Sequence, residues 1–138
     1  MQVQSRTPQA PLGDRSPPEI RAAVDRVARH CAAGRNGAVI RATGETDPAD
    51  DAAPVLLTYR AVALARVGMF RSALTTFGQA LRSPGCSTEV RHFVLRQRAE
   101  VYAAEGRHAQ ARRDVRRILA EDPTVDEAHA RLTQLGAR

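Results

Sequence analysis

The chain contains two stretches, residues 57–81 and 95–119, that repeat one pattern of apolar and small residues. The offset is a constant 38 residues, so that Leu57 aligns with Leu95. Self-similarity with a period of roughly 20 to 50 residues is typical of architectures in which one supersecondary unit stacks on the next. The repeat therefore predicts a stacked fold, and folds of this kind commonly bind other proteins along an extended surface.

The composition favours helices around one apolar core. With 138 residues the chain has the size of a single domain. It is rich in Ala, has no Trp and only 4% aromatic residues, and β-branched runs are scarce. Because Ala has the highest helix propensity, we expect a mainly helical protein. The two cysteines, Cys31 and Cys86, have no metal or redox spacing, so we expect reduced thiols.

The charge is basic, and every basic residue is Arg. The 21 basic residues outnumber the 15 acidic ones, which gives a net charge of +6. Arg binds carboxylates and phosphates through a planar, bidentate fork, whereas Lys offers a point charge. The abundance of Arg and Ala, which have GC-rich codons, suggests a bacterial source. The N-terminal residues lack the apolar core of a signal peptide and no stretch has the length of a membrane span, so we expect a cytoplasmic protein.

Helical periodicity and turn residues predict about seven helices. Gly34, Gly68 and Gly106 each interrupt an apolar pattern of helical spacing and mark a turn. Ser87 can cap the fifth helix, and residues 124–127 have the pattern of a capping box for the last one. The expected helices cover residues 16–31, 38–42, 51–67, 70–82, 87–105, 108–120 and 124–136.

The two copies resemble tetratricopeptide repeats (TPRs), which are helical hairpins of about 34 residues. The resemblance rests on Leu57, Ala61, Leu64, Gly68, Ala73, Phe77 and Ala80 in the first copy, and on Leu95, Ala99, Tyr102, Gly106, Ala111, Val115, Ile118 and Pro123 in the second. Arg60 and Arg98 depart from the pattern, because the family often has Leu at this position. The resemblance implies an all-α fold of antiparallel helical hairpins, stacked as a short right-handed solenoid.

The resemblance also implies how the chain is organised. We expect a disordered N-terminal arm over residues 1–15 and one TPR-like repeat domain over residues 16–138. The domain would consist of a degenerate hairpin (16–50), two repeats (51–83 and 87–122) and a capping helix (124–136). The capping helix would have one apolar stripe and a polar outer face, which suits the open end of a stack.

By the resemblance, the protein is an interaction module, such as an adaptor, a scaffold or a chaperone-like protein. In this family the first helix of each hairpin lines a concave groove that receives a peptide or a helix. The expected groove residues are Val55, Thr58, Tyr59, Val62, Arg66, Phe93, Arg96, Gln97, Glu100 and Arg131. Such a mixture of apolar and cationic side chains suits an amphipathic partner segment with some acidic residues.

Two other classes of function stay open. A basic patch on one helix would suit a nucleic acid or another polyanion, and its residues are Arg107, Arg112, Arg113, Arg116 and Arg117. No aromatic stacking platform accompanies this patch, so the sequence favours it less. Alternatively, the ends of a short stack could pair with a second copy and form a homo-oligomer.

Motifs for catalysis, cofactors and metals are missing from the sequence. The four histidines, His30, His92, His108 and His129, have no metal-ligand spacing with each other or with Cys. No phosphate-binding loop or dinucleotide fingerprint is present. We therefore expect no enzymatic activity, no cofactor and no membrane partner.

Overall fold

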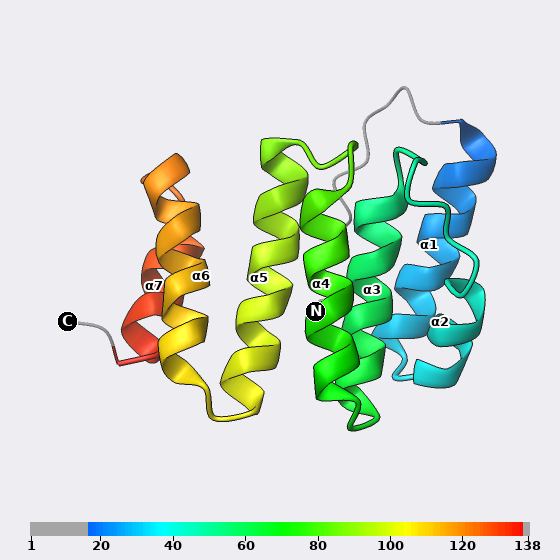
Figure 1. Ribbon diagram of the computed structural model, residues 1–138. Coiled ribbons are helices and arrows are strands. Elements are labelled where there is room, and N and C mark those ends of the chain that lie inside the picture. Colours follow the sequence, from blue (N-terminus) through cyan, green and yellow to red (C-terminus); the bar gives the residue numbers. More distant parts are fainter. Residues whose placement is uncertain (1–16, 137–138) are drawn as a thin grey trace, which may run out of the picture. The chain divides into compact units, whose positions relative to one another are not determined.

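The structure is a computed structural model that describes residues 17–136. Within these residues the chain is all-helical, with seven helices and no strand, which confirms the predicted all-α class (Figure 1). The helices are α1 (Pro18–Ala32), α2 (Asn36–Ala42), α3 (Ala53–Arg66), α4 (Phe70–Arg82), α5 (Thr88–Ala104), α6 (His108–Glu121) and α7 (Asp126–Gln134). All of their bounds lie within two residues of the expected ones.

The turns inside the helical hairpins are closed by glycines in the left-handed conformation. Gly68, between α3 and α4, has a φ of 89°. The N–H of Met69 then donates to the carbonyl of Leu64, five residues back, at 2.8 Å. This closure satisfies carbonyls at the end of α3, and only Gly adopts the required φ without steric cost. The turns at Gly34 and Gly106 repeat the same closure, so the first hairpin shares its turn geometry with the two clear repeats.

The starts of two helices test the predicted caps. The Oγ of Ser87 accepts a hydrogen bond from the N–H of Val90 at 3.3 Å, which confirms the cap of α5. The capping box that begins at Thr124 is wrong, because α7 begins only at Asp126 and has no side-chain cap. The Thr124 hydroxyl instead donates to the carboxylate of Asp122 at 2.6 Å. The Thr124 hydroxyl is therefore bound to Asp122 and does not cap α7.

The contacts of the chain define two compact units, one up to Val94 and one from Leu95 onward. In the first unit α3 is the central helix and packs against α1, α2 and α4. Tyr59 of α3 meets Phe93 edge to face, with ring centroids 5.6 Å apart. Small side chains such as Ala61, which has no exposed surface, allow the neighbouring helices to approach closely.

The second unit contains the second half of α5 together with α6 and α7. Helix α6 turns Ala111, Val115 and Ile118 inward, and each is at most 2% exposed. Helix α7 packs against α6, and Ala128 of α7 and Leu135 just after it are buried. One side of α6 is thereby covered by the C-terminal helix.

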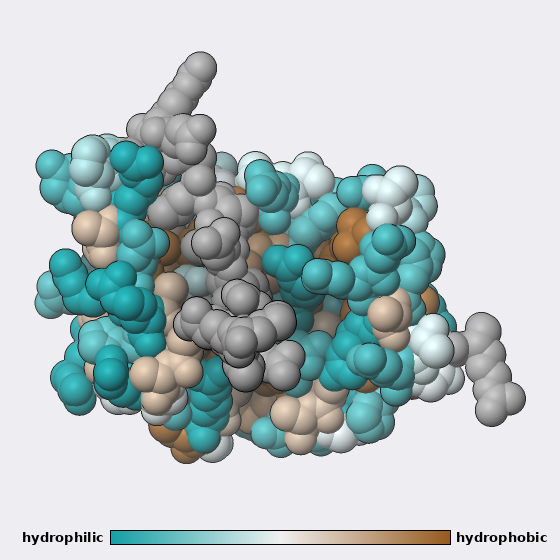
Figure 2. Space-filling model, turned by 180° about the vertical axis from the view of Figure 1, so that it is seen from behind, coloured by the Kyte–Doolittle hydropathy of each residue, from teal (hydrophilic) through white to brown (hydrophobic). Residues whose placement is uncertain are grey.

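The expected N-terminal arm lies outside the described residues, and the single repeat domain over residues 16–138 stays a prediction. Among residues 17–136, no helix is both long and apolar enough to cross a membrane. Figure 2 shows one face of the molecule, on which hydrophilic side chains predominate and hydrophobic ones appear in small groups. In this part of the chain, the large hydrophobic residues that are most exposed are Val67 and Met69, beside the α3–α4 turn.

Candidate partner-binding site

A pocket of about 170 Å³ lies among α5, α6 and α7, entirely within the second unit. Its apolar lining consists of buried side chains from all three helices, namely Ala99, Val115, Ile118 and Ala128. Its remaining lining is charged and consists of Arg96 and Glu100 of α5 with Glu127 and Arg131 of α7. The pocket therefore offers an apolar floor to one side chain and charged groups to the atoms around it.

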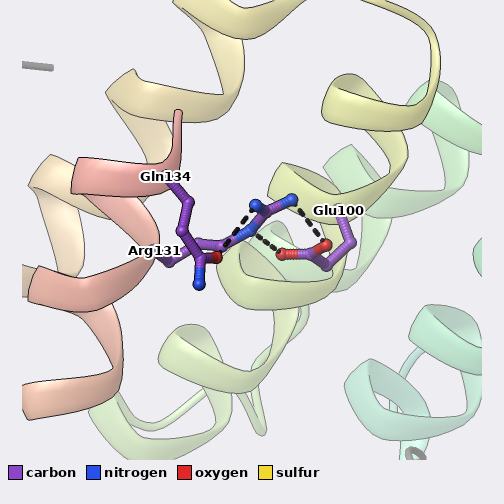
Figure 3. Close-up of polar contacts among 3 residues, drawn as sticks. All are labelled: Glu100, Arg131 and Gln134. Atoms are coloured by element: carbon purple, nitrogen blue, oxygen red, sulfur yellow. Dashed lines mark hydrogen bonds and ion pairs between the residues drawn. The ribbon is translucent and has the colours of Figure 1, made fainter. Parts of the chain in front are cut away.

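One side of the pocket is fixed by an ion pair between α5 and α7 (Figure 3). Arg131 donates through Nε and Nη2 to the two carboxylate oxygens of Glu100, at 2.6 and 2.9 Å. Its Nη1 also donates to Oε1 of Gln134 at 3.2 Å. The side chain of Glu100 is 52% exposed, so the pair contributes at most about 1 kcal/mol to stability. Its main effect is to fix the position and the charge of this part of the rim.

Arg96 differs from Arg131, although both line the same pocket. Its Nε is buried and has no hydrogen-bond partner among the described residues. A buried donor without an acceptor costs roughly 1–3 kcal/mol, and buried polar groups are rarely left in this state. Arg96 is thus the one guanidinium of the pocket that holds no acceptor at its buried edge within the described part of the chain.

A second ion pair positions the two helices that form the pocket's walls. Arg98 of α5 donates through Nε and Nη2 to the carboxylate of Asp114 on α6, at 2.9 and 2.7 Å. The hydrogen bond with Asp114 raises the pKa of Arg98 further above its usual range, so the guanidinium stays charged. Asp114 is only 3% exposed, which the sequence did not reveal, because an Asp among four Arg is typical of a solvated face. The available signal was Arg98 itself, which stands where tetratricopeptide repeats often have Leu and therefore needs a partner for its charge.

Five of the ten expected groove residues are buried in the structure. Val55, Thr58, Tyr59, Val62 and Phe93 are each at most 7% exposed, so they pack in the core and leave almost no surface for a partner. The expectation that they line an open groove is corrected by their packing. Four of them belong to α3, which has three other helices around it, and Phe93 of α5 packs against Tyr59.

Of the other groove residues, the structure brings three together. Arg96, Glu100 and Arg131 surround the pocket, whereas Gln97 is half-buried and does not line it. Three of the predicted groove residues thus line the pocket, beside Glu127 and an apolar floor that were not among the predicted residues.

Arg66, the last expected groove residue, holds the end of α1. Its Nη1 donates to the carbonyl of Cys31 at 2.7 Å and approaches the Cys31 sulfur at 3.4 Å. Burial raises the pKa of the Cys31 thiol, and burial likewise raises the pKa of the Tyr59 hydroxyl well above its usual range. Both groups are therefore neutral at physiological pH, and the thiol is a poor nucleophile.

Two further Arg side chains hold helix ends in the same way. Arg60 donates to the carbonyl of Ile40 near the end of α2 at 2.8 Å. Arg112 donates to the carbonyl of Leu135, just after α7, at 2.9 Å. Cations are favourable at helix C-termini, where carbonyls lack partners and the helix dipole is negative. Part of the chain's Arg content thus has a structural role that spacing in the sequence does not reveal.

The predicted basic patch is split by this arrangement. All of the patch except Arg107 belongs to α6. Arg112 is partly buried against the C-terminal end of α7. The others are exposed, namely Arg113, Arg116 and Arg117 on α6 and Arg107 in the turn before it. Three exposed guanidinium groups on one helix remain as a cationic surface.

No metal site is apparent in the described part of the chain, where no three side chains of His, Cys, Asp or Glu are grouped so as to hold an ion. No protein-family model matches the chain, and a search of curated proteins found no match either. Interpretation of the site therefore rests on its own geometry.

Proposed function

We propose that the protein is a TPR-like interaction module that binds a segment of another protein, with the pocket among α5, α6 and α7 as the anchor. The observation that carries the proposal is the pocket itself, which joins an apolar floor to a charged rim. The doubled repeat of the sequence supports a stack of helical hairpins, and stacks of this kind bind partners. We further propose that the protein acts as an adaptor in the cytoplasm of a bacterium.

The pocket suits a single apolar side chain. Burying a side chain of the size of Val, Leu or Met contributes roughly 1.5–3 kcal/mol. The rim is partly preorganised, because Arg131 and Glu100 already hold each other in place. Preorganisation reduces the side-chain entropy that a complex loses on binding. One anchor of this kind surrounded by polar contacts is the usual composition of a binding hot spot.

Peptide selection on the purified full-length protein tests the proposal. A library of random displayed peptides should yield sequences that share an apolar anchor residue. These peptides should bind the wild type but not Ala128→Phe, because the larger side chain would fill the pocket from α7. Ala130→Phe is the matched control, because Ala130 lies on the same helix, is exposed and does not line the pocket.

Thermal unfolding followed by circular dichroism must show that both variants stay folded, and Ala128→Met replaces Ala128→Phe if the larger ring disrupts packing. Peptides that bind the wild type and the folded pocket variant equally well would contradict the proposal. A selection that enriches no sequence would also count against it.

The exposed Arg residues of α6 favour a second candidate, which is polyanion binding. Within residues 17–136, Arg113, Arg116 and Arg117 form no hydrogen bond or ion pair, so their charge is available. A labelled single-stranded oligonucleotide should then bind with an affinity that falls steeply with salt. Changing all three residues to Gln should abolish this binding, and unchanged binding would remove the candidate.

A further inference from the structure

We infer that the pocket selects partner segments that carry a carboxylate next to the apolar anchor, and that Arg96 is the residue that recognises it. The inference rests on the proposed function and adds the chemistry of the partner. Three features support it, namely the charges around the pocket, the lack of an ion pair at Arg96 in the described chain and the position of Glu127.

Two of the four charged side chains around the pocket pair with each other, and within residues 17–136 the other two do not. Arg131 and Glu100 neutralise each other through two hydrogen bonds. Arg96 forms no such pair in the described part of the chain, and its Nε is buried without an acceptor. The α5 side of the pocket therefore has one guanidinium without an ion pair among the described residues, and a partner's carboxylate would pair with it.

A carboxylate is the acceptor that fits this donor best. The planar fork of Arg matches the two oxygens of a carboxylate, and charge-assisted hydrogen bonds are about twice as strong as neutral ones. A neutral acceptor would form a hydrogen bond with the Arg96 guanidinium but would leave its charge without a partner. Arg96 is half-buried, so an ion pair with it is screened less by water than one on an open surface.

Glu127 fixes the side on which the acidic residue must lie. It belongs to α7, lines the same pocket as Arg96 and is exposed, and no described residue pairs with it. A carboxylate placed toward Glu127 would be repelled, whereas one placed toward Arg96 would be attracted. The partner is thus oriented, with its acidic side chain toward α5 and a neutral or basic side chain toward α7.

The spacing on the partner follows from the shared pocket. Arg96 and the apolar floor line one cavity of about 170 Å³, so the carboxylate and the anchor side chain must come from neighbouring positions on one face. On a helical partner these positions are three or four residues apart, and on an extended partner they are two apart.

Two matched display libraries test the inference. In the first, a fixed Leu is followed at each of these spacings by Asp or Glu, and in the second by the uncharged isosteres Asn or Gln. The wild type should bind the best acidic peptides about tenfold more tightly than their amide counterparts. Arg96→Gln should remove this preference and keep the weaker binding of the apolar anchor. Arg96→Lys should restore it in part, because the charge returns without the fork.

Arg117→Gln is the charge-matched control, because it removes one exposed Arg of the same unit that does not line the pocket. The acidic preference should survive in this variant. Equal affinity of the wild type for acidic and amide peptides would overturn the inference, as would an acidic preference that persists in folded Arg96→Gln. If Arg96→Gln does not fold, Arg96→Lys takes its place, and an acidic preference as strong as that of the wild type in this variant would overturn the inference.

The test separates failure of the inference from failure of the proposed function. If peptides of both libraries bind the wild type with equal affinity but do not bind Ala128→Phe, the pocket stays the anchor and only the role of Arg96 is removed. If the peptides bind Ala128→Phe as well as they bind the wild type, the pocket is not the binding site and the inference fails with it.

Discussion

The ion pair between Arg98 and Asp114 should be a major stabilising contact of the second unit, and Asp114→Asn should show it. The pair is bidentate, with distances of 2.7 and 2.9 Å, and the side chain of Asp114 is only 4% exposed. Removing one partner of a fully buried pair costs about 3–5 kcal/mol, because the other charge stays behind unpaired. The side chain of Arg98 keeps 21% of its surface in water, and Asn still accepts one hydrogen bond. We therefore expect Asp114→Asn to lower the free energy of unfolding by about 2 kcal/mol.

A double-mutant cycle separates the pair from its surroundings. Arg98→Leu alone leaves a buried carboxylate without its partner and should cost about 3 kcal/mol or more. The combination of Arg98→Leu with Asp114→Asn removes both charges, so it should be more stable than Arg98→Leu alone. The expected coupling is at least about 1 kcal/mol. Urea unfolding at neutral pH, followed by far-ultraviolet circular dichroism, measures each term.

The control for this cycle is Glu105→Gln, which removes an exposed carboxylate just after α5 and should change stability by less than about 0.5 kcal/mol. A cost of Asp114→Asn as small as that of the control would refute the reasoning. Additive single substitutions, with no coupling, would show that the two side chains act independently.

Three further predictions concern the backbone, a helix end and pH. Gly68→Ala should cost about 1–2 kcal/mol, because φ is 89° there. Gly78→Ala inside α4 should stabilise by about 0.5–1 kcal/mol, because the flexible end of Arg82, whose Nη1 lies 3.2 Å from the added Cβ, can move aside; thermal melts of the two variants should move in opposite directions. Arg66→Ala should cost about 1 kcal/mol in urea unfolding, because the Cys31 carbonyl near the end of α1 loses its donor, and no loss would exclude this capping role. The free energy of unfolding should fall as pH rises above about 9, because burial raises the pKa of Cys31 above its ordinary 9.0 and the unfolded chain therefore releases that proton first. Tyr59, whose pKa is also raised by burial, should add to the fall above pH 10.0. In unfolding curves measured across this range, Cys31→Ala should remove the onset of the fall near pH 9.

The helices and turns could be predicted because they depend on local sequence. The spacing of apolar residues on either side of Gly68 and Gly106 predicted the helices and the turns between them. These glycines mark turns because they adopt a left-handed φ. The cap of α5 by Ser87 is equally local. At Thr124 the local signal failed, because Asp122 competes for the same hydroxyl.

The candidate site could be predicted only in part, because it depends on contacts between distant residues. The helix α3 is apolar on nearly all sides, which is typical of a buried helix and was the signal that its residues, such as Val55 and Val62, belong to the core. The roles of Arg66 and Arg112 at helix ends depend on carbonyls 35 and 23 residues away in the chain. The periodicity of the sequence does not predict contacts between residues so far apart in the chain.

The central claim is that a partner segment binds in the pocket among α5, α6 and α7, and NMR tests it most directly. The amide chemical shifts of the full-length protein would be recorded while the best selected peptide is added. The account predicts that the largest changes fall on lining residues of α5 and α7, and that Ala128→Phe abolishes them. These residues are Arg96, Ala99, Glu100, Glu127, Ala128 and Arg131. Changes that instead cluster around Arg113 and Arg117, with the pocket residues unmoved, would contradict it.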